Sequence, residues 1–279
     1  MRHRLPQVCL NGSRTRADHP HLPISPAELA AAARDSVAAG AGDIHLHPKD
    51  RDGTDTLAAP HVAAALAAVR AAVPGIPVGV TTGAWTTPDP ERRAALVRAW
   101  TVLPDHASVN WHEDGADLVA DALLDRGIGI EAGLYSGTDA IRRFLAWPSA
   151  DRVLRVLAEV RDTDPHTAPS TAAALLGDLT GTSAPVLLHG EDGSAWPVLR
   201  LAAAEGLSTR IGLEDVLHLP NGSPASDNAE LVRCAAAATR TRPAGDTSPA
   251  FSNPSGGGPV AGAEWNVTFP HSDRPTFEE

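Results

Sequence analysis

The sequence is poor in several residue types, and each shortage narrows the class of protein. Its two cysteines, Cys9 and Cys234, lie far apart and form no CxxC pair. A disulfide framework is therefore not expected, and a reducing cytoplasm is the expected compartment. Aromatic residues make up only 4% of the chain, so its core must consist mainly of Ala, Val, Leu and Ile.

Long apolar runs and positive charge are scarce as well. The N-terminus, MRHRLPQ, has no apolar signal-peptide region, and no later stretch approaches the roughly 20 apolar residues of a membrane span. The formal net charge is −11, and Lys49 is the only lysine. A nucleic acid or an anionic membrane would require a basic face, so neither is an expected partner.

Segments typical of strands alternate with Ala-, Leu- and Arg-rich segments at helical spacing. The first helical segment has complete end signals: Ser25 as N-cap, Pro26 in the first turn, Glu28 to complete a capping box, and Gly40 near its end. The predicted strands are 7–12, 42–47, 77–82, 106–111, 127–134, 152–160, 185–190 and 209–215.

Eight such repeats predict a parallel sheet closed into a (β/α)8 TIM barrel, because an open doubly wound sheet usually has fewer strands. The GxGxxG fingerprint of a dinucleotide-binding sheet is also absent. We expect one catalytic barrel over residues 1–240. The Pro/Gly/Ser-rich stretch 241–279 reads as a flexible tail or an arm that contacts another subunit.

Period-two alternation predicts which strand residues face the barrel lumen. Branched apolar side chains usually fill this space, and buried charges cost several kcal/mol each unless paired or ligated. Here many inward positions are polar, which indicates an active site. The predicted inward residues are His45, His47, Ser108, Asn110, Glu131, Arg155, Glu159, Arg210 and Glu214.

His45 and His47 are the strongest candidates for metal ligands. Two imidazoles separated by one residue on a strand point the same way and can chelate one ion. The eighth strand of a closed barrel lies two strands from the second, so Glu214 can complete the set. Two histidines and a carboxylate are a ligand set typical of catalytic zinc. His189, and more weakly His112, fit a substrate hydrogen-bond donor or a core histidine better than a ligand.

Several segments together resemble the β-keto acid cleavage enzyme family. They are AGAGDIHLHPKDRDG, VTTGAW, SVNWHEDG, GIGIEAGL, LLHGEDGSAWP and TRIGLEDVLHLPNGSPASDNAELV. The resemblance runs from about residue 8 to residue 240. It implies a zinc-dependent (β/α)8 barrel, often a homo-oligomer, that condenses a β-keto acid with acetyl-CoA to give acetoacetate and a new acyl-CoA.

Carried over residue by residue, the resemblance assigns roles to particular side chains. His45, His47 and Glu214 match the zinc ligands, Asp215 matches the general base, and Arg210 matches the arginine that orients it.

The same resemblance indicates four substrate-binding positions. Glu131 matches a pocket carboxylate, and Thr82 and Ser108 match hydroxyl positions near the substrate. Asn110 joins them through its inward parity. A carboxylate at Glu131 would favour an amine-bearing substrate.

Three other functions stay open at this point. A metal-dependent amidohydrolase places its HxH on the first strand, whereas here it lies on the second. A Schiff-base aldolase needs an inward lysine, and Lys49 follows the second strand in a charged loop. A non-catalytic barrel that binds a metal or an acyl-CoA would need no base, so Asp215 and Arg210 argue against it.

Overall fold

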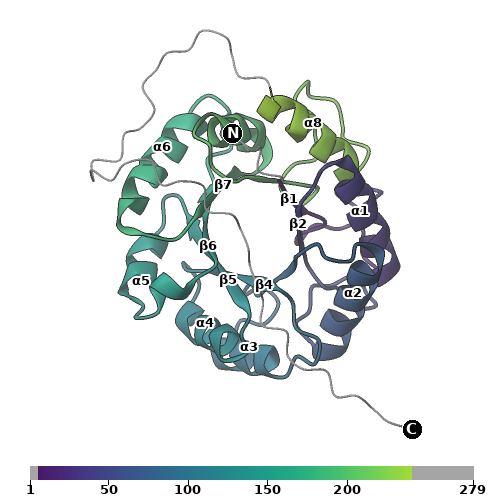
Figure 1. The fold of residues 1–279 in the computed structure, drawn as a ribbon, viewed down its shortest axis with the longest axis vertical. Coiled ribbons are helices and arrows are strands. Elements are labelled where there is room, and N and C mark those ends of the chain that lie inside the picture. The colour runs from purple at the N-terminus through teal and green to yellow at the C-terminus, as the bar shows by residue number, and fades with distance from the viewer. Residues whose placement is uncertain (1–5, 241–279) are drawn as a thin grey trace. The chain divides into compact units, whose positions relative to one another are not determined.

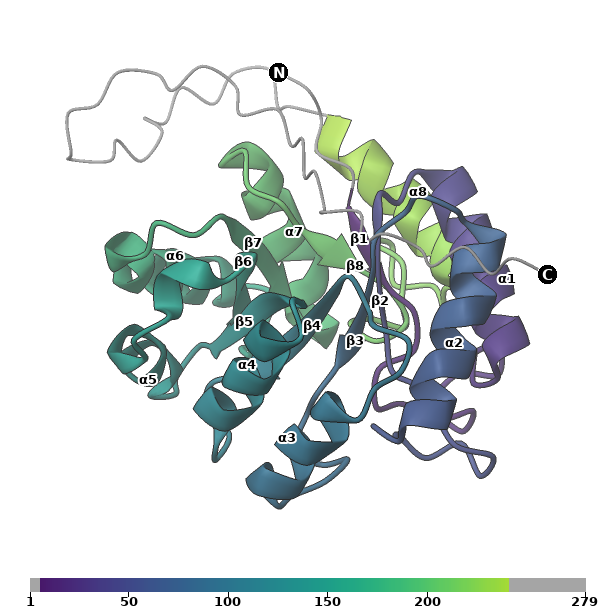
Figure 2. The same cartoon turned by 60° about the horizontal axis from the view of Figure 1, so that its bottom comes forward.

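The computed structural model describes residues 6–240, in which eight parallel strands alternate with eight α-helices (Figures 1 and 2). The strands are β1 (Gln7–Cys9), β2 (Asp43–Leu46), β3 (Val78–Thr81), β4 (His106–Asn110), β5 (Gly129–Tyr135), β6 (Arg155–Val160), β7 (Val186–Gly190) and β8 (Arg210–Ile211). The helices are α1 (Pro26–Ala39), α2 (Ala59–Ala72), α3 (Pro90–Arg98), α4 (Ala116–Asp125), α5 (Ala140–Ala146), α6 (Ala168–Asp178), α7 (Ala195–Ala204) and α8 (Asn228–Arg240).

The pairing of the strands confirms the predicted (β/α)8 barrel. Neighbours follow the order β7-β6-β5-β4-β3-β2-β1-β8, and every pair is parallel. A parallel bridge between Leu187 of β7 and Ser208, just before β8, joins the two ends of this series. The helices surround the ring of strands (Figure 1).

The local causes of these elements are those that the residue pattern predicts. Ser25 caps α1: its hydroxyl accepts from the Glu28 amide, and the Glu28 carboxylate accepts from the Ser25 amide. Gly40 ends the helix in the left-handed conformation, at φ +117°. On β2, the outward residues Ile44 and Leu46 are fully buried in the apolar layer between strands and helices.

The last strand is shorter than the predicted 209–215 because its backbone turns at Gly212. The amides of Asp215 and Val216 donate to the Gly212 carbonyl at 2.9 and 3.0 Å. This turn ends β8 at Ile211 and brings Glu214 to the C-terminal mouth of the barrel.

The N-terminal end of the lumen holds a buried network of charges. Arg155 donates to Glu131 at 2.7 Å and to Asp43 at 2.5 Å, and Gln7 donates to Glu131 at 2.9 Å. His106 lies between the two carboxylates, 2.8 Å from Asp43 and 3.1 Å from Glu131. Burial opposes its charge, but the Glu131 and Asp43 carboxylates raise the pKa of His106 to about 10. The network thus pairs two anions with two cations.

This network predicts a pH-dependent contribution to stability. The folded pKa of His106 lies above its ordinary 6.5, so its contribution is complete below pH 6.5 and declines as the pH rises towards 10. We expect His106→Gln to lower the free energy of unfolding by about 3–5 kcal/mol at pH 6. Urea denaturation should show a smaller difference at pH 9.5. The exposed His166 is the control, and His166→Gln should change little at either pH. A difference that does not vary with pH would contradict a protonated His106.

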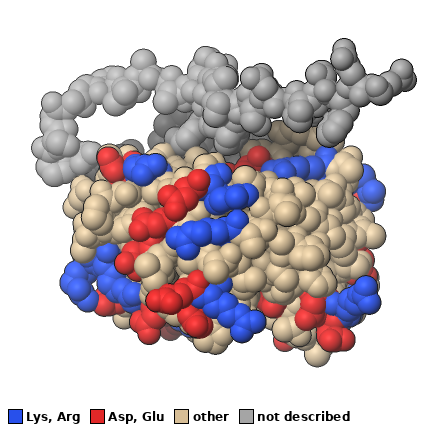
Figure 3. Space-filling view, turned by 90° about the horizontal axis from the view of Figure 1, so that it is seen from below, with Lys and Arg blue, Asp and Glu red and all other residues tan. Residues whose placement is uncertain are grey.

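Within residues 6–240, no helix is long and apolar enough to cross a membrane. Cys9 is buried and Cys234 half-buried, and both are free thiols. Acidic and basic side chains are interspersed on the face that Figure 3 shows. The tail predicted for 241–279 lies outside the described residues.

Candidate active site and metal centre

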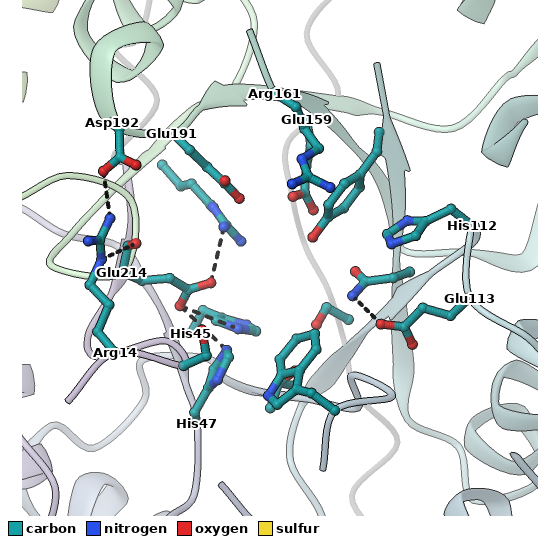
Figure 4. Close-up of a pocket in the computed structure, with 17 residues that line it drawn as sticks. Arg14, His45, His47, His112, Glu113, Glu159, Arg161, Glu191, Asp192 and Glu214 are labelled. Carbon is teal, nitrogen blue, oxygen red and sulfur yellow. Dashed lines mark hydrogen bonds and ion pairs between the residues drawn. The ribbon is translucent and has the colours of Figure 1, made fainter. Parts of the chain in front are cut away.

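His45, His47 and Glu214 meet at one side of a cavity at the C-terminal mouth of the barrel (Figure 4). The Nε2 atoms of both histidines lie 3.7 Å from Oε2 of Glu214, and this oxygen is buried without a hydrogen-bond partner among the described residues. Ligand atoms around a tetrahedral zinc ion are separated by roughly 3.4 Å. Burial lowers the pKa of His45 to about 4, so its imidazole is neutral at pH 7. Burial also opposes the charge of His47, but the Glu214 and Asp55 carboxylates raise its pKa to about 9, so a bound metal would displace one proton from this ring. The three residues therefore fit a divalent ion.

Backbone features hold these three side chains together. His45 pairs with Cys9 across β1 and β2, and β1 also pairs with β8, so the turn after β8 is brought next to the histidines. Gly12 adopts a left-handed conformation at φ +59° and lies against Glu214. A Cβ at Gly12 would lie 2.5 Å from Cγ of Glu214, so any larger residue would displace this carboxylate.

Arg210 joins Asp215 to the cluster of His45, His47 and Glu214. Its Nη2 donates to Oδ1 of Asp215 at 2.8 Å and to Oε1 of Glu214 at 3.1 Å. Burial raises the pKa of Asp215 to about 6 in spite of the Arg210 charge. Oδ2 of Asp215 has no hydrogen-bond partner within residues 6–240. The carboxylate is therefore ionised near neutral pH and retains a free oxygen, as a general base requires.

The cavity has a volume of about 480 Å³, which suits a small organic molecule. Its wall combines charged, aromatic and hydroxyl side chains from almost every strand end. Besides His45, His47, Glu214 and Arg210, the lining residues are Ser13, Arg14, Thr81, Trp85, Ser108, Asn110, His112, Glu113, Tyr135, Glu159, Arg161, Glu191 and Asp192.

Comparison with known proteins decides the family. The sequence profile of the beta-keto acid cleavage enzymes matches residues 7–141 and 151–247, which is most of the chain. The chain belongs to the beta-keto acid cleavage enzyme family.

Solved structures similar to this family member show the same fold. ObcA in a ternary complex with a C4-CoA adduct and oxalate is 16% identical, with a TM-score of 0.64 over 77% of this chain and 62% of its own. ObcA in a binary complex with oxaloacetate is 19% identical, with a TM-score of 0.59 over 77% and 62%. The 3-dehydroquinate dehydratase of Geobacillus kaustophilus HTA426 is 12% identical, with a TM-score of 0.56 over 86% and 93%. The chain thus spans about three-fifths of the length of ObcA.

Two of the substrate-binding positions predicted for this member of the family lie on the cavity wall, and two do not. Ser108 and Asn110 line the cavity. The predicted position is off by one residue at Thr82. The Thr82 hydroxyl donates to the Ser108 carbonyl, and Thr81 lines the cavity instead. Glu131 does not lie on the cavity wall. It belongs to the buried network at the N-terminal end of the lumen, where Arg155 and Gln7 donate to its carboxylate.

His112 and His189, which the sequence left open as ligands, substrate donors or core residues, have different positions. His112 lines the cavity, with its ring 4.3 Å from that of Tyr135. His189 is buried between Glu159 and Asp215, 3.6 and 4.0 Å from their carboxylates, and burial lowers its pKa to about 3. Its ring is therefore neutral, and it does not belong to the metal cluster.

Asp55 is a functional candidate that sequence reasoning missed. Its Oδ2 lies 2.8 Å from Nδ1 of His47 and accepts from the Trp85 indole at 2.9 Å, and its Oδ1 accepts from Lys49 at 2.5 Å. The Trp85 ring stacks on His47, with 5.6 Å between centroids. A carboxylate on the outer nitrogen of a metal-binding histidine fixes the tautomer and the orientation of the ring. The preceding charged loop, PKDRDG, gives no sequence signal that would single out Asp55.

We expect Asp55→Asn to weaken metal binding by about 10- to 100-fold, because the amide holds the His47 ring less strongly. Metal affinity is measured by titration of the apoprotein against a competing chelator. Trp85→Phe removes the other donor to the same oxygen and serves as the control, with a smaller expected change. Unchanged affinity in Asp55→Asn would show that packing alone orients His47.

Proposed function

We propose that this chain is a zinc-dependent enzyme that condenses a β-keto acid with acetyl-CoA, giving acetoacetate and a new acyl-CoA. One observation carries the proposal. Oε2 of Glu214, which is buried and has no hydrogen-bond partner within residues 6–240, faces two histidine nitrogens, and Arg210 connects the same glutamate to Asp215. The candidate metal ligands therefore line the cavity, and Arg210, which lines it as well, connects them to the buried Asp215 carboxylate. Family membership and the CoA adduct and oxaloacetate bound to ObcA support the same reaction.

His45, His47 and Glu214 would hold the metal ion. When bound there, a divalent ion supplies Lewis-acid polarisation to the keto and carboxylate oxygens of the substrate. Two imidazoles and a carboxylate with a position left for substrate are a donor set suited to zinc. Asp55 keeps Nε2 of His47 directed at this position.

Asp215 would remove a proton from the methylene carbon between the keto group and the carboxylate. The carbanion attacks the thioester carbonyl of acetyl-CoA, a C–C bond forms, and the CoA thiolate leaves. The thiolate then attacks the original keto carbon, and the bond between this carbon and the former methylene carbon breaks. Acetoacetate leaves after its carbanion takes back the proton from Asp215, and the other fragment is the new acyl-CoA. Arg210 keeps the Asp215 carboxylate in position throughout.

A second histidine–carboxylate cluster within residues 6–240 does not favour a hydrolase with two metal ions. Asp43, His106 and Glu131 lie close enough together to be considered as ligands. Arg155 already contacts both carboxylates, and His106 is protonated between them. A cation and an imidazolium thus balance the two negative charges without a metal.

The decisive experiment assays the purified full chain for acetoacetate formed from acetyl-CoA with a panel of β-keto acids. The assay is repeated after chelation and after zinc is added back. We expect acetoacetate from at least one acid, loss of activity on chelation, and recovery with zinc. Bound metal without acetoacetate from any acid would overturn the proposed reaction.

A further inference from the structure

Lys49 is the only lysine of the chain, and the proposed reaction gives it no role. Its side chain is 1% exposed, and it is not among the residues that line the cavity. A Schiff base would require the amine to meet the substrate in the cavity, so the aldolase role considered for Lys49 does not fit this position. The ammonium instead lies beside the candidate metal ligands, where it contacts two segments of the chain.

The Lys49 ammonium connects the loop after β1 with the loop after β2. Its Nζ donates to the Gly12 carbonyl at 3.0 Å and to Oδ1 of Asp55 at 2.5 Å. An antiparallel bridge between Lys49 and Asp55 holds their backbones side by side. An ammonium has three donors and no acceptor, so it can serve acceptors of two separate segments at once.

The contact with Asp55 leads to His47. Oδ2 of Asp55 lies 2.8 Å from Nδ1 of His47, and Lys49 binds the other carboxylate oxygen. The terminal bond of an aspartate rotates easily, so a carboxylate held at one oxygen alone keeps its plane poorly, whereas one held at both oxygens is fixed. Lys49 therefore steadies the carboxylate that orients the His47 ring.

The contact with Gly12 leads to Glu214. A Cβ at Gly12 would lie 2.5 Å from Cγ of Glu214, so this loop packs directly against the glutamate. The preceding residue, Asn11, is bound to the His47 backbone: its Oδ1 accepts from the His47 amide and its Nδ2 donates to the His47 carbonyl, both at 2.9 Å. Lys49 holds the same loop at the next residue, and a shift of this loop would move Glu214 relative to His47.

We propose that Lys49 is a positioning residue that couples the two sides of the metal centre, holding His47 through Asp55 and Glu214 through Gly12. This inference rests on the metal site of the proposed function. His47 and Glu214 come from distant parts of the chain, and the Lys49 ammonium joins the groups that place them. A metal ion therefore meets both ligands in one preset arrangement.

The first test uses the wild-type chain, because a single lysine gives a single set of side-chain signals. The full chain is produced with isotope-labelled lysine, and the Cε and Nζ signals of Lys49 are followed by NMR as zinc is added to the apoprotein. We expect both signals to shift until the metal site is saturated, and to shift less in Asp55→Asn at saturating zinc. Signals that stay in place while zinc binds would overturn the inference. An equal shift in Asp55→Asn would show only the field of the ion and would overturn it too.

The second test removes the ammonium. Lys49→Met keeps a flexible side chain of similar length, and we expect it to weaken zinc binding by about tenfold or more, measured by titration against a competing chelator. Arg126→Met is the matched control, because Arg126 donates to the Trp100 carbonyl at 2.8 Å and neither lines the cavity nor belongs to the ligand cluster. Its zinc affinity should change by less than about threefold. Equal affinities of Lys49→Met and the wild type would contradict the coupling.

The visible spectrum of the cobalt(II)-loaded protein reports the arrangement of the ligands rather than the stability of the fold. We expect Lys49→Met to change this spectrum and Arg126→Met to leave it as in the wild type. Lys49→Arg keeps a cation with several donors, so it should recover part of the zinc affinity. A Lys49→Met protein that is less stable but has the wild-type spectrum and affinity would show that Lys49 only supports the fold.

The double variant Lys49→Met/Asp55→Asn tests the path through Asp55. Residues that act through one another have non-additive effects, so the loss of zinc affinity should be smaller than the product of the two single losses. A loss equal to that product would show that Lys49 does not act through Asp55.

These measurements need no turnover, so they separate the coupling from the proposed reaction. If acetoacetate forms in a zinc-dependent way but Lys49→Met keeps the wild-type affinity and spectrum, the proposed function stands and the coupling is wrong. If Lys49→Met loses zinc affinity as expected but no β-keto acid gives acetoacetate, the coupling stands and the reaction is wrong.

Discussion

Replacing Asp215 with asparagine is expected to lower kcat by about 10²- to 10⁴-fold, because the amide cannot accept the methylene proton. The effect should fall on kcat more than on KM, since Asp215 acts on a substrate already held by the metal cluster. The measurement is steady-state acetoacetate formation with the best acid of the panel, together with metal content.

Asp215→Glu is the companion variant, because Asp215→Asn leaves the buried Arg210 without part of its charge partner and could destabilise the fold. The glutamate keeps the charge and a basic oxygen, so it should retain folding and recover part of the rate. Glu159 and Glu191 also have raised pKa values of about 7 and line the cavity. A different result would identify Glu159 as the base: the kcat of Asp215→Asn would stay within about tenfold of the wild-type value, and the kcat of Glu159→Gln would fall by about 10²- to 10⁴-fold.

Replacing Glu214 with glutamine is the second change with a large expected effect. A neutral amide removes the only anionic ligand of the cluster, so bound zinc should fall from about one equivalent to a small fraction, and activity should fall with it. Metal content after dialysis against a weak chelator, measured by mass spectrometry, reports the first effect directly.

His112→Gln is the matched control for metal binding. His112 lines the same cavity but does not belong to the cluster of His45, His47 and Glu214, so the variant should keep its zinc. A Glu214→Gln protein that retained a full equivalent of zinc at unchanged affinity would show that the ion binds elsewhere.

Much of the barrel could be predicted from local pattern. Alternating apolar residues such as Ile44 and Leu46 identify strands buried on their outer face, and Ser25 with Glu28 identifies where α1 begins. These signals are local because they follow from the two-residue period of a strand and from the unsatisfied amides of a helix N-terminus. The placement of His45 and His47 on the inner face follows from the same period.

Loop residues could not be placed in this way. Asp55 lies in the segment after β2, and Arg14 and Trp85 lie in the segments after β1 and β3. A loop has no period that relates position to direction, so only the folded chain shows that Asp55 contacts His47 and that Trp85 stacks on it.

The height of an inward residue along the barrel was decided by tertiary structure. Parity predicted that Glu131 and Glu159 both face the lumen, and both do. The register pairs Glu131 with Arg155, whereas Glu159 pairs with Tyr135, four residues further along each strand. The Glu131 carboxylate is therefore neutralised in the buried network at the N-terminal end of the lumen, whereas the Glu159 carboxylate faces the cavity. The sequence by itself determined the repeat, the inward residues and the placement of His45 and His47 on one face, because these depend on contacts a few residues apart. Only the stagger of neighbouring strands, which is set by hydrogen bonds between distant segments, decided which inward charges face the cavity.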